Sequence, residues 1–312
     1  MPRLSGLEDR KRPIETGRNV PTLYPPLSEL TFSWVRTIAG YKLLYTGFDL
    51  AAIGVLVALL VVSKQPLHRI LTCAWNPCVV ISFAMCGHHD SLAIFTLLAS
   101  ILFIILRKPA LSVSFLALSV ISKFFSLLLL PIILRRTRPA YAALFVAVVG
   151  LSYLPFLSAG TRLFKGLSMY AAGWEGNDSL FRLIRLAGNS KSQAELVAGV
   201  LVVVLVASAL KRRLEPLAAS LLLIAGLLFL SPNAFPWYFT WVVPFLCFYP
   251  RAPLLLMSIT SVLGYAPVVA YAAGQPYRDS TFILLLEYVP VLTWLLYEGC
   301  RALRPGSEAE IS

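Results

Sequence analysis

The chain has 312 residues, of which 58% are hydrophobic and 13% are charged, and its formal net charge is +12. Soluble domains carry roughly 25% charged residues, so this composition, with a mean hydropathy of +0.77, excludes an ordinary soluble protein and indicates a polytopic membrane protein. The Lys and Arg residues fall in short clusters between apolar runs, which sets nucleic acid aside as a partner. The five cysteines show no metal-ligand spacing and predict neither a zinc site nor a disulfide framework.

The predicted elements follow four segments. Residues 1–19 are polar and basic, and we expect them to be extended or disordered. Residues 20–45 predict an extracytoplasmic loop and an amphipathic helix lying in the membrane interface, 46–300 a transmembrane bundle, and 301–312 a cytoplasmic tail. Apolar runs predict about 8–9 spans, so the fold class is all-α, a polytopic transmembrane helix bundle. The expected spans lie at 48–62, 70–86, 91–106, 139–156, 194–210, 215–230, 236–249, 253–272 and 281–298, with a long loop at 157–192.

Residues 110–134 are apolar except for Lys123 near their middle. A single tilted crossing would place the basic clusters at 107–108 and 135–138 on opposite faces. Two half-membrane helices meeting near Ser122-Lys123 would keep both clusters on the cytoplasmic face, where positive charge is favoured. Broken helices at membrane depth are tolerated where they are buried or line a cavity. We therefore predict a re-entrant pair with Lys123 facing an aqueous cavity, the alternative being a lysine that snorkels along one tilted helix.

The loops that alternate with the basic ones are rich in aromatic, amide and carboxylate side chains. They lie at 24–26, 87–90, 174–178, 231–238 and 275–279, and the positive-inside rule places them all on the extracytoplasmic face. Aromatic rings beside hydrogen-bonding groups suit sugars, whose hydroxyls need partners and whose C–H faces pack on rings. An aromatic belt at the lipid headgroups explains Trp174, Trp237 and Tyr238 individually, but it does not call for Asp90 or Asn177 among them.

The segment Gly87-His88-His89-Asp90 separates two apolar runs and holds two of the three histidines. An Asp at the start of a helix is commonly an N-cap that also interacts with the helix dipole. The alternative is the rim of a polar site. No cofactor is expected, and a divalent metal held by His88, His89 and Asp90 is disfavoured because adjacent helical side chains point in different directions.

An ordered series of motifs resembles the C-type polytopic membrane glycosyltransferases, in particular the bacterial α-mannosyltransferase-like group that uses polyprenyl-phosphate-mannose or related donors. The resemblance covers roughly residues 20–290, and no single motif in it is specific. Its motifs are Pro21-Thr22-Leu23-Tyr24-Pro25-Pro26, Trp75-Asn76-Pro77, Gly87-His88-His89-Asp90, Lys123 followed by 127–131, Trp174-Glu175-Gly176-Asn177-Asp178, and Ser231-Pro232 with Pro236-Trp237-Tyr238.

The resemblance implies transfer of a hexose from a lipid-phosphate sugar to a lipid-linked or envelope glycan acceptor at the outer face of the plasma (inner) membrane. The reaction needs a carboxylate for the acceptor proton and cationic groups for the departing phosphate. The expected carboxylate is Asp90, with Asp178 as the second candidate. The expected phosphate contacts are Lys123, His88, His89 and Arg278. The expected lining of the sugar and lipid cavity is Tyr24, Trp75, Asn76, Trp174, Asn177, Trp237 and Tyr238.

The usual catalytic Asp of that group precedes the Tyr-Pro-Pro element, and no equivalent stands here. Glu8, Asp9 and Glu15 lie in basic surroundings and are poor substitutes. We therefore expect an N-terminally incomplete or truncated relative. The alternatives are a multi-pass transporter or lipid flippase, for which an intramembrane lysine is also typical, and a non-catalytic scaffold subunit.

Overall fold

The computed structural model describes residues 21–188 and 190–302 and is all-helical over these ranges, without strands. The all-α prediction is confirmed for this part of the chain. Five of its helices are long and apolar enough to cross a membrane, or six if one bent pair forms a single span. This number is below the predicted 8–9 because the predicted spans at 70–86 and 91–106 form one bent pair, and the run at 216–230 forms a helix too short for an ordinary crossing. The helices at 109–120 and 124–134 are also short, as expected for a pair of half-length helices. The predictions for 1–19 and for 303–312, and with them Glu8, Asp9 and Glu15, lie outside the described residues.

The N-terminal helices differ from the predicted interfacial helix at 20–45. Helix α1 (Pro26–Ser33) is short, and α2 (Ile38–Val62) runs without a break for 25 residues. Thr37 caps α2, because its side chain accepts a hydrogen bond from the Gly40 amide. Residues 38–45 therefore begin a helix that is long and apolar enough to cross a membrane, and they do not form a separate amphipathic helix. Their mixed polarity arises because this end of α2 faces polar and aromatic neighbours.

The predicted span at 70–86 is divided into short pieces. They are η1 (Leu67–Ile70), α3 (Leu71–Ala74), α4 (Pro77–Val80) and the π-helical turn η2 (Ile81–Met85). The break between α3 and α4 falls at Trp75-Asn76-Pro77, because a residue before proline is driven out of the helical region. The α4–η2 segment and α5 (Asp90–Ile105) meet at 120°. Asp90 thus lies at the first residue of a helix that starts at a sharp bend.

The break predicted near Ser122-Lys123 is present. Helix α6 (Pro109–Val120) ends there, Lys123 is extended, and η3 (Phe124–Leu129) and α7 (Leu130–Leu134) follow. Because α7 packs against α6, the chain reverses its direction at Lys123. This arrangement agrees with a pair of half-length helices.

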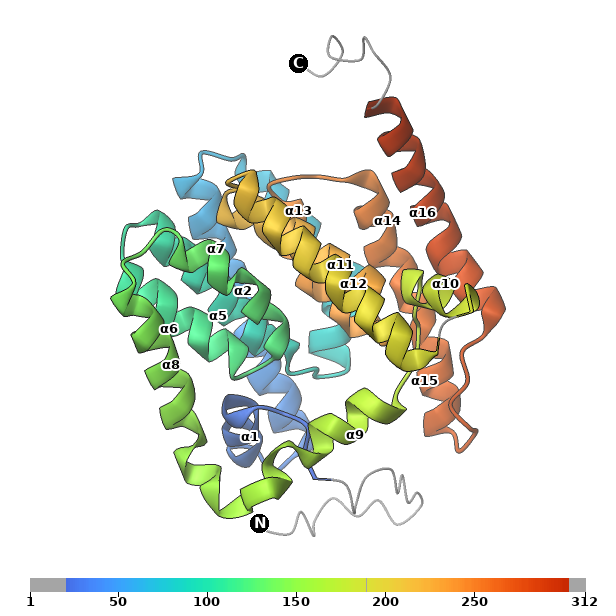
Figure 1. The fold of residues 1–312 in the computed structure, drawn as a ribbon, viewed down its shortest axis with the longest axis horizontal. Coiled ribbons are helices and arrows are strands. Elements are labelled where there is room, and N and C mark those ends of the chain that lie inside the picture. Colours follow the sequence, from blue (N-terminus) through green and yellow to red (C-terminus); the bar gives the residue numbers. More distant parts are fainter. Residues whose placement is uncertain (1–20, 189, 303–312) are drawn as a thin grey trace.

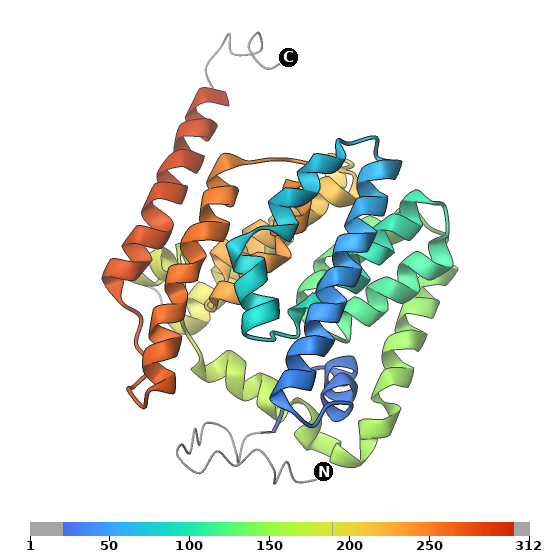
Figure 2. The same cartoon turned by 180° about the vertical axis from the view of Figure 1, so that it is seen from behind.

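The loop predicted at 157–192 is largely helical. Helix α8 (Ala140–Tyr153) continues through η4 (Leu154–Phe164), with a kink at Gly160, into α9 (Lys165–Gly173), and α10 (Leu180–Leu186) follows. Both views show α1 and α9 at the same end of the bundle, far from the last turn of α16 (Thr281–Ala302) (Figures 1 and 2). There Gly166 touches the chain ahead of α1, since a Cβ at Gly166 would lie 2.1 Å from the Pro21 carbonyl oxygen.

The C-terminal half contains two long helices, α11 (Lys191–Lys211) and α16, and several shorter helical segments between them. Its elements are α11 (Lys191–Lys211), α12 (Pro216–Leu230), η5 (Pro236–Trp241), α13 (Val243–Leu246), α14 (Ala252–Thr260), η6 (Ser261–Gly264), α15 (Tyr265–Ala272) and α16 (Thr281–Ala302). These positions match the predicted apolar runs. The run at 236–249 forms two short helices, because Pro236 and Pro244 each begin a new one.

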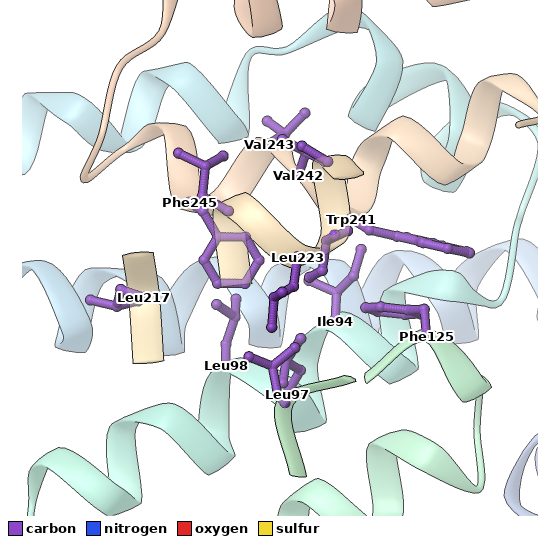
Figure 3. Close-up of a cluster of buried hydrophobic side chains, with 14 of the residues drawn as sticks. Ile94, Leu97, Leu98, Phe125, Leu217, Leu223, Trp241, Val242, Val243 and Phe245 are labelled. Carbon is purple, nitrogen blue, oxygen red and sulfur yellow. The ribbon is translucent and has the colours of Figure 1, made fainter. Parts of the chain in front are cut away.

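The core is built where the short helices meet α5. Figure 3 shows Leu97 and Leu98 of α5 packed beside Leu223 of α12 and Phe245 of α13. In the same cluster, Phe125 of η3 stacks on Trp241 of η5, with ring centroids 4.2 Å apart. Short helices thus lie inside the bundle, where their free ends are surrounded by protein. This packing brings the breaks at Asp90 and Lys123 together.

Candidate functional site

A cavity of about 480 Å³ lies between the chain ahead of α1, η3, α9, the start of α11, the end of α12 and η5. Ligand pockets are typically ~300–1,000 Å³ in volume. The walls are mostly apolar, and their charged side chains are Lys123 and Glu195. The lining residues are Leu23, Tyr24, Pro25, Lys123, Phe124, Phe125, Leu127, Leu128, Leu167, Tyr170, Ala171, Glu195, Leu227, Leu228, Ser231, Pro232, Asn233, Tyr238 and Trp241. We call this space the apolar cavity.

Lys123 is the cation of this cavity, and its position is fixed by Asp90. The Lys123 Nζ donates to Asp90 Oδ1 over 2.6 Å, and the Trp241 Nε1 donates to the same oxygen over 2.7 Å. The Asp90 side chain is 0% exposed, whereas that of Lys123 is 12% exposed. The Asp90 carboxylate therefore lies deeper in the protein than the Lys123 ammonium group. Asp90 Oδ2 has no hydrogen-bond partner in the described part of the chain.

Aromatic rings surround the ammonium group. Lys123 Nζ lies 4.4 Å from the centroid of the Tyr238 ring and 5.3 Å from that of Trp241. Tyr238 stacks on Trp241 and its hydroxyl lies 3.2 Å from that of Tyr170. A cation over aromatic faces is attracted to their negative charge. The rings and Asp90 together hold the lysine without filling the space in front of it.

The two adjacent histidines face different neighbours. His88 stacks on Trp237 with ring centroids 4.1 Å apart. His89 is buried among Tyr24, Phe32 and Tyr45, with Tyr24 closest at 4.5 Å. His89 Nδ1 lies 3.9 Å from Asp90 Oδ2. The structure thus brings His89 to the Asp90 cluster and turns His88 away toward Trp237.

Asn177 and Asp178 belong to a second polar cluster. The Asn177 side chain donates to the Ala234 carbonyl oxygen and to Glu287 Oε1, over 2.7 Å and 2.9 Å. Asp178 forms an ion pair with Arg182 at 2.8 Å, and Arg182 also reaches Asp279. Burial raises the pKa of Asp178, while Arg182 acts in the opposite direction. Neither Asn177 nor Asp178 lines the apolar cavity, so this cluster joins α10 to α16 instead.

Several other residues predicted for the site are exposed on the surface or buried away from the apolar cavity. Trp75 is 81% exposed, and Trp174 is 52% exposed. Arg278 is exposed, with no contact to Asp90 or Lys123. Asn76 is buried, where it caps α4 and donates to Ser258.

Of the predicted lining residues, the structure brings Tyr24 and Tyr238 to the apolar cavity. Burial raises the pKa of Tyr24, so its hydroxyl remains protonated at neutral pH.

Among the polar residues that line the cavity, Trp241, Tyr170 and Glu195 were not predicted from the sequence. Trp241 and Tyr170 lie three or four residues from predicted motifs, so helical spacing from Tyr238 and Trp174 was a usable signal. Glu195 stands near the start of an apolar run, where an acidic residue commonly interacts with the helix dipole, so its position carried no functional signal. It pairs with Lys191 at 3.8 Å.

No group of three His, Cys, Asp or Glu side chains with metal-binding geometry occurs in residues 21–188 and 190–302. The apolar cavity combines hydrocarbon walls with one ammonium group, that of Lys123. An ammonium group held at the wall of an apolar space can compensate the charge of a phosphate, and the apolar walls can cover a hydrocarbon chain.

Residues 176–297 match the family model of the MptB C-terminal domain. Comparisons with curated proteins and with solved structures gave no match. The matched region includes Trp237, Tyr238 and Trp241, whereas Asp90 and Lys123 precede it. Together with the apolar helices, the match supports the resemblance of this chain to membrane mannosyltransferases.

Proposed function

We propose that the protein is a multi-pass membrane glycosyltransferase of the plasma membrane. It transfers a mannose-like hexose from a polyprenyl-phosphate donor to a lipid-linked or envelope glycan acceptor at the extracytoplasmic face. The observation that carries this proposal is the apolar cavity with Lys123 held at its wall. The match of residues 176–297 to the MptB C-terminal domain supports the same class of enzyme.

The cavity suits both parts of a polyprenyl-phosphate donor. Its walls of Leu, Phe and Pro side chains can cover the first isoprene units, and Lys123 can meet the phosphate. A hydrogen bond between a charged pair contributes about 1.5–3 kcal/mol, which corresponds to about 10- to 150-fold in affinity. Tyr238 and Trp241 offer flat faces for the sugar ring beside Lys123.

The transfer forms one bond and breaks another. The acceptor hydroxyl oxygen bonds to the anomeric carbon, the bond from that carbon to the phosphate oxygen breaks, and the bonding pair leaves with the lipid phosphate. The hydroxyl proton passes to a carboxylate. The leaving phosphate gains negative charge, which the Lys123 ammonium stabilises.

Two carboxylates have different parts in this scheme. Asp90, the first candidate from the sequence, binds Lys123 and Trp241 and lies beneath them. We assign it the positioning of Lys123. Glu195 lies on the wall of the apolar cavity and is half-buried, so we assign it the acceptance of the proton. Asp178 is held by Arg182 and keeps no role in the reaction.

The test is sugar transfer by purified protein in proteoliposomes that contain labelled polyprenyl-phosphate-mannose and membrane glycan acceptors. The parent should transfer the label, and Lys123→Met combined with Asp90→Asn should raise the donor KM at least about ten-fold. Lys165→Met removes an exposed lysine outside the apolar cavity and should leave the KM unchanged. Glu195→Gln should lower kcat about 100-fold or more, as for loss of a general base.

Absence of transfer by folded parent protein with every polyprenyl-phosphate hexose tested would overturn the proposal. Movement of intact donor across the bilayer without transfer would favour the flippase alternative. An unchanged donor KM in the double variant would remove Lys123 from the phosphate site.

A further inference from the structure

A second cavity of about 370 Å³ lies across His89 from the apolar cavity. It is enclosed by the end of α1, the turn into α2, the first residues of α2 and the end of the 81–86 segment. Its lining residues are Phe32, Val35, Arg36, Thr37, Ile38, Tyr41, Lys42 and Cys86. We call it the cationic cavity, because it contains two basic side chains and no acidic one.

Neither basic side chain of this cavity, Arg36 or Lys42, is paired with an acidic one among residues 21–188 and 190–302. Lys42 is half-buried, and its stem packs on Gly87, where a Cβ would lie 3.1 Å from Lys42 Cγ. Gly87 has φ +74°, so this close approach depends on glycine. Arg36 is exposed, and two like charges that line one hollow create a positive potential that favours an anionic ligand.

The remaining walls indicate which kind of anion. The Phe32 and Tyr41 rings lie 5.7 Å apart at 33°, and Tyr41 is half-buried. Aromatic faces pack on the C–H faces of sugars and polyols. The cavity begins at the first turn of the 25-residue helix α2, whose dipole adds to the positive potential there. A phosphate beside a polyhydroxyl ring matches both sets of walls.

The cationic cavity is separated from the apolar cavity by a partition of rings. Tyr24 lines the apolar cavity, Phe32 lines the cationic cavity, and their ring centroids lie 5.4 Å apart. His89 contacts both rings, at 4.5 Å and 5.3 Å, and the next residue, Asp90, holds Lys123. The two cavities thus flank one site from two sides.

We propose that the cationic cavity is a second ligand site, which takes a phosphate-bearing sugar or polyol, either free or as the headgroup of a lipid. Arg36 and Lys42 bind the phosphate, and Phe32 and Tyr41 contact the ring. This inference goes beyond the proposed function, because the binding of a phosphorylated polyol does not depend on sugar transfer. The donor lipid occupies the apolar cavity, whose lysine is already paired with Asp90.

Cys86 provides a direct reporter, because it is exposed and lines the cationic cavity. Cys300 is the other exposed cysteine of the described chain and lies at the end of α16, whereas Cys73, Cys78 and Cys247 are buried. In a Cys300→Ser variant, the rate of maleimide alkylation reports on Cys86. In a Cys86→Ser variant, the same rate reports on Cys300 and serves as the control.

The experiment measures alkylation of purified protein in phosphatidylcholine bicelles with three probes added in turn. The probes are mannose 6-phosphate, phosphatidylglycerol and polyprenyl phosphate. At ten times its Kd, a ligand in the cationic cavity should slow the labelling of Cys86 about ten-fold, without changing that of Cys300. Protection by phosphatidylglycerol alone identifies a lipid-anchored headgroup, and protection by mannose 6-phosphate alone identifies a soluble phosphate. Either result supports the proposal.

Variants link the protection to the two cations. Arg36→Gln and Lys42→Gln should each weaken protection about ten-fold or more, as for loss of a charged hydrogen bond. The matched control is the pair Arg162→Gln and Lys165→Gln, which removes two exposed cations at the same end of the bundle, outside both cavities. Protection by polyprenyl phosphate alone would overturn the proposal, as would the absence of protection by any probe or equal loss in the control pair.

The outcome is distinguishable from that of the proposed function. Protection of Cys86 in a protein that transfers no sugar would leave this site standing and remove the glycosyltransferase activity. Transfer by a protein whose Cys86 is never protected would have the opposite meaning.

Discussion

The ion pair between Lys123 and Asp90 leads to a double-mutant cycle whose two single variants should differ. Removing one partner of a buried ion pair costs about 3–5 kcal/mol in the free energy of unfolding, because the other charge is left without a partner. The two side chains are not equally buried, since that of Asp90 is 0% exposed and that of Lys123 is 12% exposed at the cavity wall. The size of each loss therefore depends on which charge remains.

Lys123→Met keeps the length of the side chain but leaves a fully buried carboxylate with Trp241 as its hydrogen-bond donor. We expect a loss near the upper end, about 5 kcal/mol. Asp90→Asn keeps an oxygen that can accept from Trp241 and Lys123, and the remaining ammonium group reaches the cavity. We expect a loss near about 3 kcal/mol. The double variant leaves no unpaired charge, so it should be more stable than Lys123→Met alone.

The assay is reversible unfolding of the purified protein in mixed micelles by titration with sodium dodecyl sulfate, followed by tryptophan fluorescence. Lys165→Met is the control for exchanging a lysine at an exposed position and should change the free energy of unfolding by less than about 0.5 kcal/mol. Losses that simply add in the double variant would refute the ion pair. A larger loss of unfolding free energy for Asp90→Asn than for Lys123→Met would contradict the reasoning that the Asp90 carboxylate is the more deeply buried of the two charges.

Three further predictions test the fold around the site. Gly166→Ala should destabilise the protein by about 1–3 kcal/mol in the same unfolding assay, because the new Cβ would lie 2.1 Å from the Pro21 carbonyl oxygen; an unchanged midpoint would contradict this contact. Trp75→Ala should leave sugar transfer unaltered, since Trp75 is 81% exposed, and a large fall in kcat would return it to the site. Topology reporters fused after residues 108 and 136 should both be cytoplasmic, whereas opposite sides would rule out the re-entrant pair.

Much of the helical pattern could be predicted from hydropathy, since α11 and α16 follow long apolar runs, although Glu287 and Pro290 lie within α16. The break at Lys123 was also predictable, because a lysine within an apolar segment favours a buried or cavity-lining interruption. The helices within 154–173 were not, since their polar residues and Gly160 resemble a loop. Gly166 in this segment packs against Pro21, a contact that is distant in the sequence and that local helix propensity does not report.

Individual residues of the candidate site could be predicted from the sequence, but the contacts between them could not. Asp90 and Lys123 were both identified, but each was given its own role, whereas they bind each other over 33 positions of sequence. Trp241 joins them from 151 positions away. Such contacts depend on how the short helices pack inside the bundle, so hydropathy and motif spacing cannot reveal them. Asn177 was expected at the sugar, but its buried amide instead meets Glu287.

The three residues at the centre of the site all lie at interruptions of helices. Asp90 begins α5 at the 120° bend, Lys123 is the extended residue before η3, and Trp241 ends η5. A helix end inside a membrane exposes polar backbone groups, which must be buried in protein or reach a cavity. Interruptions are therefore driven to pack together in the interior, and they carry their polar side chains with them. The same burial that makes a broken helix tolerable thus places a carboxylate, an ammonium group and an indole N–H within hydrogen-bonding distance. In this chain, the polar residues of the candidate site therefore lie at the breaks between apolar runs, where the short helices pack against one another.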